Sequence, residues 1–392
     1  MATEKLSVEN FGPIQKADLD LRKVTVLIGE QASGKSVLAK LATIVRNENT
    51  LGGHFENELE KHKISSYSTP KSVVFYENNL FKVSFKNEIL KNDISDNALE
   101  DALLNYNEIR LSYNEISLKL RSEGDILIKK NLREDRRFLL LRLGEAYAIV
   151  RTFLLTETYI PAERMIVSFL NDHIFDFDTQ FSKIFSNSLL QFAELFNISK
   201  YSFSGSKLLA ADLVYKFEAD LDKFELPNGE ILQINEVSTG IQTLIPLQAV
   251  IESKIDEKEK ILFIVEEPEL NLFPTIQNKL VQYLIEKCTK GDNRLIITTH
   301  SPYILTALSN LIEAKNVVKQ NPDLHDAVAQ IIPPQYWLDF DDVSAYFVGG
   351  GTAYSIRDEE NQNIDANPID AVSNETGRIF DQLLDLKYAT TA

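Results

Sequence analysis

The stretch that decides the fold is Gly29-Glu30-Gln31-Ala32-Ser33-Gly34-Lys35-Ser36, which matches the spacing Gly-x4-Gly-Lys-Ser in full. A short apolar run, Val24-Thr25-Val26-Leu27-Ile28, precedes it, and apolar residues at helical spacing follow it. A buried strand, a glycine loop and a helix in this order surround a phosphate with backbone N–H groups. We therefore expect a nucleotide site, in which Lys35 binds the β- and γ-phosphates and the Ser36 hydroxyl binds Mg²⁺.

Strands and helices alternate around this loop, which is typical of a sheet covered by helices. The first residues alternate on both sides of the turn Asn10-Phe11-Gly12-Pro13, so they predict an antiparallel N-terminal pair of strands. Further along, buried strands are expected at Ile261–Val265 and Arg294–Thr298, and helices at 241–253 and 276–288. The sequence thus predicts an α/β P-loop NTPase with a mostly parallel sheet and an antiparallel N-terminal part.

The middle of the chain is predicted to be a mainly helical insertion. Residues 72–85 indicate two short strands around Glu77-Asn78-Asn79, and helices are expected at 98–121, 138–156 and 182–196. The predicted organisation is a nucleotide-binding domain from 1–50 and 159–318, an insertion at 51–158 and an acidic extension at 319–392.

Carboxylates and a histidine follow the two later buried strands. Glu266-Glu267-Pro268-Glu269 comes directly after one strand, and His300 comes after the other. Ligands of an open α/β sheet bind at the carboxyl ends of its strands. Glu266 would hold Mg²⁺, and His300 would contact the γ-phosphate. Glu267 would act as the base that activates the attacking water, and Glu269 is the next candidate for that base. The alternatives are a charged loop and a structural histidine. Most P-loop proteins carry Asp at the position of Glu266, so we expect slow hydrolysis.

A second anion site is predicted at Ser238-Thr239-Gly240, where a helix begins. A helix N-terminus with a serine hydroxyl favours a negatively charged ligand. One chain cannot wrap this site and the phosphate loop around the same phosphate. We therefore expect two copies of the chain to enclose the nucleotide.

Together these motifs resemble the ABC-type ATPase heads of the SMC and RecF class. They are more similar still to the OLD-like (overcoming lysogenization defect) ATPases of bacterial anti-phage systems. In this resemblance Ser238–Gly240 is a degenerate ABC signature, Glu266–Pro274 covers the Walker B motif and the D-loop, and His300 is the H-loop. Asn10–Ile14 and Tyr159-Ile160-Pro161-Ala162-Glu163-Arg164 are also similar to segments of that class.

The resemblance implies an ATPase that uses ATP and Mg²⁺ and forms a homodimer or higher oligomer. It also implies a separate effector, a nuclease or toxin, as in Septu-, retron- and PARIS-type systems, because the residues after His300 do not clearly resemble the Toprim nuclease of OLD proteins. Alternatives are a RecF-like DNA-repair clamp and a slowly hydrolysing scaffold. The chain departs from the class at Phe273, where Asp or His is usual, and no Q-loop glutamine is identified.

Composition sets outer limits on function. The net charge is −17 and Cys288 is the single cysteine, which excludes a disulfide framework and a cysteine zinc site. No apolar run approaches the roughly 18–20 residues of a membrane span, and the start does not resemble a signal peptide, so we expect a cytoplasmic protein.

Two charged segments remain open to more than one interpretation. The basic cluster from Lys129 to Arg142 is either a solvated helix face or a local patch for nucleic acid or an acidic partner. The acidic run Asp358-Glu359-Glu360 is either a solvated loop or a metal site.

Overall fold

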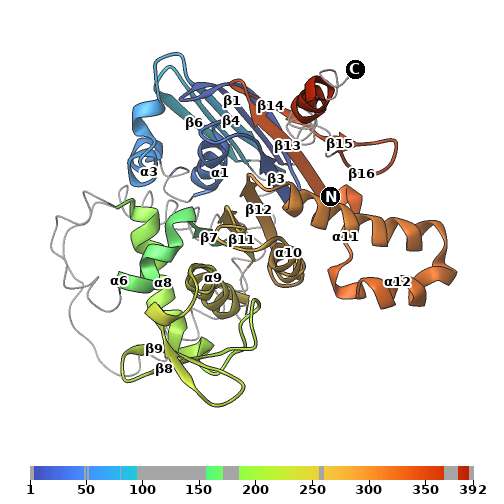
Figure 1. Cartoon of the computed structure of the whole chain (residues 1–392). Helices are drawn as coiled ribbons and strands as arrows, with labels where there is room; N and C mark the ends of the chain where they lie inside the picture. The colour runs from blue at the N-terminus through green and yellow to red at the C-terminus, as the bar shows by residue number, and fades with distance from the viewer. Residues whose placement is uncertain are drawn as a thin grey trace, which may run out of the picture.

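The computed structural model describes residues 4–47, 50, 53–79, 81–94, 156–170, 185–255, 260–365 and 378–387. Its centre is an 11-stranded sheet with the strand order β6-β5-β4-β1-β2-β14-β13-β3-β12-β11-β7 (Figure 1). The strands from β13 to β7 run parallel to one another, and β1, β2, β4, β5 and β6 pair antiparallel. The predicted α/β fold, parallel around the phosphate loop and antiparallel in its N-terminal part, is confirmed.

The parallel strands are β13 (Val343–Gly349), β3 (Val24–Ile28), β12 (Arg294–Thr299), β11 (Ile261–Glu266) and β7 (Thr156–Ile160). The other strands of this sheet are β1 (Glu4–Phe11), β2 (Ile14–Leu21), β4 (Val73–Glu77), β5 (Phe81–Lys86), β6 (Ile89–Ile94) and β14 (Thr352–Ser355). A separate 3-stranded sheet contains β8 (Val214–Glu218), β9 (Leu221–Glu225) and β10 (Ile231–Gln233). A hairpin pairs β15 (Arg357–Asp358) with β16 (Asn363–Ile364).

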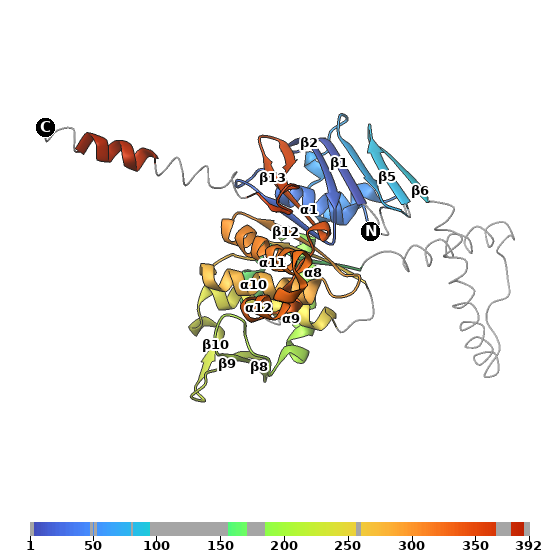
Figure 2. The same ribbon diagram turned by 90° about the vertical axis from the view of Figure 1, so that its right-hand side faces the viewer.

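Helices cover both faces of the main sheet (Figures 1 and 2). One face carries α1 (Lys35–Ile44) and α3 (Phe55–Lys61). The other carries α8 (Asn187–Phe203), α9 (Thr239–Ile255), α10 (Pro274–Cys288) and α11 (Pro302–Gln320). The short helices α6 (Val167–Leu170) and α12 (His325–Ile331) complete the labelled helices, and residues 378–387 form a further helix.

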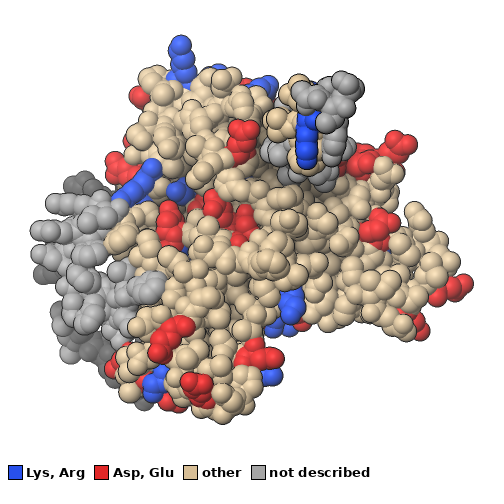
Figure 3. Space-filling model, in the orientation of Figure 1, with Lys and Arg blue, Asp and Glu red and all other residues tan. Residues whose placement is uncertain are grey.

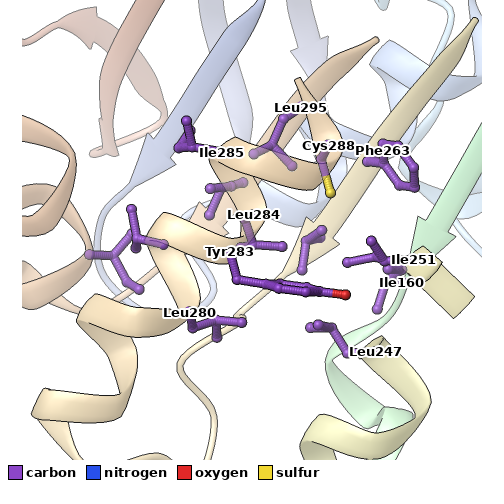
Figure 4. Packing of buried hydrophobic residues seen from close by; sticks show 14 of the residues in the cluster. Ile160, Leu247, Ile251, Phe263, Leu280, Tyr283, Leu284, Ile285, Cys288 and Leu295 are labelled. Atoms are coloured by element: carbon purple, nitrogen blue, oxygen red, sulfur yellow. The ribbon is translucent and has the colours of Figure 1, made fainter. Parts of the chain in front are cut away.

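Two hydrophobic cores result from the alternation of side chains along the buried strands. In β11, Ile261, Phe263 and Val265 belong to the core under α8–α11, whereas Leu262 and Ile264 belong to the core under α1. Figure 4 shows Phe263 among residues of α9 and α10, where the thiol of Cys288 is also buried. A strand that is apolar at every position is therefore explained by helices on both of its faces.

The predicted elements around the site are confirmed. The first strands are β1–β5, and the later strands and helices are β11, β12, α9 and α10, with ends shifted by one or two residues. The helix predicted at 182–196 corresponds to α8, which extends seven residues further. The helix predicted at 98–121 lies outside the described residues, as does the basic cluster from Lys129 to Arg142. The helix predicted at 138–156 also lies outside them except for its last residue, Thr156, which is the first residue of strand β7 instead. The predicted domain boundaries stay predictions. Within the described residues, β4–β6 continue the main sheet beyond β1, and β13 lies near its centre.

A buried ionic network joins the turn after α1 to three strands of the sheet. The Glu4 carboxylate accepts hydrogen bonds from Arg46 Nε at 3.0 Å and from the Tyr76 hydroxyl at 2.9 Å, and it also pairs with Arg294 Nη1 at 2.5 Å. Burial raises the pKa of Glu4, but the two arginines more than offset this, so the net pKa is lowered. The charged network therefore stabilises the fold above the acidic range.

We predict that Arg46→Met lowers the free energy of unfolding by about 3–5 kcal/mol, because it leaves a buried carboxylate incompletely paired. The measurement is urea denaturation followed by circular dichroism. The difference from wild type should shrink as the pH falls below about 4, since protonated Glu4 no longer needs the arginine. Lys16→Met, on the exposed surface, serves as the control. A loss below 1 kcal/mol for Arg46→Met would contradict the role of the network.

Candidate nucleotide-binding site

The phosphate loop connects β3 to α1 and requires glycine at two positions. Gly34 has a φ of 105°, and a Cβ there would lie 2.4 Å from Ile14 Cδ1. A Cβ on Gly29 would lie 2.0 Å from the backbone oxygen of Val348 in β13. The loop therefore lies directly against β2 and β13, while Glu30, Gln31 and Ala32 at its tip are exposed.

Lys35 folds back into this loop. Its Nζ donates to the backbone oxygens of Gly29 at 3.0 Å and Glu30 at 2.7 Å, and its side chain is almost completely buried. Burial lowers the pKa of Lys35, and the carboxylates that follow β11 act in the opposite direction. The loop thus holds a buried cation against two carbonyl oxygens, and phosphate oxygens could replace these as acceptors.

His300, which follows β12, lies between Lys35 and Glu267. Its Nδ1 lies 3.4 Å from Lys35 Nζ, and its Nε2 lies 3.1 Å from Glu267 Oε1. Because an ammonium group only donates, this geometry makes Nδ1 the acceptor and Nε2 the protonated nitrogen of the imidazole. The contacts bring the predicted cation, histidine and base into one chain of polar groups.

Glu269 has a different position from Glu267. Its Oε1 accepts hydrogen bonds from the Thr299 hydroxyl at 2.6 Å and from the backbone N–H of His300 at 2.8 Å. This carboxylate therefore holds the backbone at the end of β12. The sequence gave no signal for this contact, because it joins residues that are far apart in the chain.

Glu266 lies at the end of β11 and is buried. Burial raises its pKa, and nearby Lys40, Ser36 and Tyr159 offset this only in part. Its Oε1 has no hydrogen-bond partner among the described residues. An unsatisfied carboxylate oxygen beside a serine hydroxyl suits Mg²⁺, which prefers oxygen ligands, so Glu266 and Ser36 are the residues that would hold it.

A buried arginine, Arg164, holds the backbone of the same turn. It lies in the 3₁₀ turn η2 (Ala162–Ile166), which follows β7. Its Nη1 donates to the backbone oxygens of Pro161 at 3.1 Å and Glu266 at 2.7 Å. Its Nη2 donates to those of Glu267 at 2.9 Å and Pro268 at 3.2 Å. Burial lowers the pKa of Arg164 to about 10, so it stays charged at neutral pH.

The predicted signature residues lie at the start of α9, against the D-loop. Ser238 and Thr239 are exposed, whereas Gly240 is buried, and a Cβ on Gly240 would lie 2.7 Å from the backbone oxygen of Asn271. Phe273 is 72% exposed. Between residues that the structure describes, no hydrogen bond or ion pair joins Ser238–Gly240 to the phosphate loop. The structure thus brings together all predicted site residues except these three.

The acidic run after β14 is held by its own hydrogen bonds. Asp358 accepts from the backbone N–H groups of Glu360 and Asn361, and Glu359 pairs with Arg357.

In the described parts of the chain, no group of three or more His, Cys, Asp or Glu side chains could hold a metal ion. No helix there is long and apolar enough to cross a membrane. Figure 3 shows acidic side chains gathered near the middle of one face, between α1 and α10.

Part of the chain is similar to a known protein family. A family model described as an AAA ATPase domain matches residues 147–305, which include Arg164, Ser238–Gly240, Glu266–Glu269 and His300 but not the phosphate loop. No curated protein sequence matches the chain.

Two solved structures show distant likenesses. The SMC head domain from Thermotoga maritima has a TM-score of 0.41 and 11% identity, over 91% of this chain and 98% of that one. An Smc head domain with an extended coiled coil, bound to the C-terminal domain of ScpA and derived from Pyrococcus furiosus, has a TM-score of 0.36 and 10% identity. That match covers 96% of this chain and 100% of the other.

The fold is that of an α/β P-loop NTPase. The segment that is similar to an AAA ATPase domain contains the carboxylates and His300 that the fold brings to the phosphate loop.

We predict that Lys35→Ala weakens ATP binding at least about a hundredfold, because two charge-assisted hydrogen bonds to phosphate are each worth about 1.5–3 kcal/mol. Isothermal titration calorimetry with Mg·ATP measures this directly. Lys279→Ala, on the exposed side of α10, is the matched control and should bind ATP as the wild type does. Wild-type affinity in Lys35→Ala would show that the loop does not bind the phosphates.

Proposed function

We propose that this protein binds Mg·ATP between two copies of the chain and hydrolyses it with Glu267 as the general base. The observation that carries the proposal is the contact chain from Lys35 through His300 to Glu267, at the edge where the parallel strands end. A cation for phosphate and a carboxylate for water lie on opposite sides of one imidazole. Phosphoryl transfer depends mainly on such positioning and on charge neutralisation.

The proposed chemistry begins with the ligand-free contacts of Lys35. When ATP binds, Lys35 exchanges the oxygens of Gly29 and Glu30 for phosphate oxygens. The Nε2–H of His300 then turns from Glu267 to the γ-phosphate, so the Glu267 carboxylate becomes available to the attacking water. Ser36 and Glu266 would hold Mg²⁺, which would supply positive charge to neutralise the phosphate oxygens.

The proposed dimer completes the site with Ser238, Thr239 and Gly240 of a second copy. Ser238 and Thr239 are exposed at the start of α9, where a helix N-terminus favours an anion. Gly240 lies against Asn271, so the signature and the D-loop form one continuous surface beside the exposed Phe273. This arrangement supports pairing in which each copy contributes its signature to the phosphate loop of the other.

The biological role that we propose is control of a separate effector protein, a nuclease or toxin, in anti-phage defence. This part is supported by the resemblance of the motifs to OLD-like ATPases. ATP-dependent pairing would change the surface that the effector meets, and hydrolysis would reset it.

Replacing Glu267 tests the chemistry. We expect Glu267→Gln to bind ATP with unchanged affinity and to lower the hydrolysis rate at least about a hundredfold, because the amide cannot accept the proton of water. Steady-state phosphate release and calorimetric ATP binding give the two values. Turnover within threefold of wild type would exclude Glu267 as the base. Wild-type protein that binds ATP without measurable turnover would favour the slow scaffold.

Replacing Ser238 tests the pairing. In the Glu267→Gln background, where ATP persists, Ser238→Arg should weaken ATP-dependent dimerisation about tenfold or more, because a charge-assisted contact is lost in both halves of the dimer. Light scattering against protein concentration, with and without Mg·ATP, measures the association. Ser202→Arg on the exposed side of α8 controls for the added charge. An unchanged mass shift would place Ser238 outside the interface.

A further inference from the structure

The backbone of Glu267 has an unusual conformation. Its φ is 41°, in the left-handed region that non-glycine residues seldom adopt. Such a conformation is strained for a residue with a side chain, and it persists only where the surrounding structure over-determines it. At Glu267 the conformation directs the carboxylate to His300, so whatever maintains it also sets the position of the base.

Arg164 contacts the peptide groups on both sides of this residue. The backbone oxygen of Glu266 belongs to the peptide before the Glu267 Cα, and that of Glu267 belongs to the peptide after it. Nη1 of Arg164 binds the first and Nη2 binds the second. Fixing both peptide planes fixes φ and ψ between them, because these are the only soft dihedrals of the residue. The Glu267 N–H, bonded to the backbone oxygen of Thr298 at 2.8 Å, adds a third restraint.

We infer that Arg164 is the positioning residue for the general base: its guanidinium fixes the left-handed backbone of Glu267 and thereby holds the carboxylate at the site of water attack. The inference rests on the proposed function of Glu267. It assigns to Arg164 no contact with ATP, since its four acceptors are all backbone oxygens.

The planar shape of arginine is essential to this role. The guanidinium presents five N–H donors in a rigid fork, whereas a lysine ammonium presents three donors at a single point. Lysine can therefore keep the buried positive charge but cannot bind the oxygens of both flanking peptides in the same geometry. Arg164→Lys separates the effect of geometry from the effect of charge.

The same segment of chain also contacts the signature helix. The Ser168 hydroxyl donates to the backbone oxygen of Gln242 in α9 at 2.8 Å, and Asn271 Nδ2 lies 3.8 Å from Met165 Sδ. Arg164 thus belongs to a segment that contacts the Glu267 turn, the D-loop and α9. In the proposed dimer, this segment joins the position of the base to the helix that meets the second copy.

The test compares catalysis with binding in Arg164→Lys. We expect kcat to fall at least tenfold, while the Kd for Mg·ATP stays within threefold, because the phosphate loop does not depend on Arg164. In the Glu267→Gln background, adding Arg164→Lys should change the residual turnover by less than threefold, since the base that it positions is already absent. Arg46→Lys, at the buried network after α1, is the matched control. It should lower thermal stability and leave kcat within threefold.

The other outcomes are decisive as well. Arg164→Lys with kcat within threefold of wild type would overturn the inference, and so would equal losses of kcat and ATP affinity. Additive losses in the double variant would assign Arg164 a role independent of Glu267 and would overturn it too. Should Arg164→Lys not fold, Arg164→Gln undergoes the same measurements, and failure of both to fold would show a requirement of the fold instead. Wild-type protein without ATP hydrolysis would remove the proposed function itself, which is a separate result.

Discussion

The site depends on one geometric constraint, which is that parallel strands end at the same edge of a sheet. β3, β12, β11 and β7 lie side by side in parallel. Each is followed at once by a polar segment: the phosphate loop, His300, the carboxylate turn and the turn that carries Arg164. The order of the strands in the sheet is therefore sufficient to place residues more than a hundred positions apart in the chain next to one another.

The electrostatics of this edge follow from how little water reaches it. Lys35, Glu266 and Arg164 are buried charged groups, and each is satisfied in a different way. Arg164 uses four backbone oxygens, Lys35 uses the oxygens of its own loop, and Glu266 keeps one oxygen without a partner among the described residues. Burying charge is costly unless it is paired or hydrogen-bonded, so a metal ion would complete the carboxylate of Glu266. Phosphate oxygens could replace the loop oxygens that Lys35 uses.

The sequence was sufficient for those parts of the site that are local in the chain. The phosphate loop carries its own glycines and its own helix. Glu266 ends the buried strand β11, Glu267 follows it directly, and His300 directly follows the buried strand β12. The contacts of Glu269 and Arg164 could not be predicted in this way, because their partners are backbone groups in distant segments. The pairing of β13 with β3 could not be predicted either. No motif in the sequence indicates which strand pairs with the edge of β3 that β12 leaves open.

The contact between Gly29 and Val348 links the beginning of the phosphate loop to a strand near the other end of the sequence. Chains are synthesised from the N-terminus, so the loop emerges before β13. The delay between them is long because chains grow at only about 5–20 residues per second. Until β13 has paired with β3, the loop lacks the surface against which Gly29 is packed, and β12 and β11 are also still to come. A nascent chain therefore has no complete nucleotide pocket until β13 has been made, and ATP can act only on protein whose central sheet is already assembled.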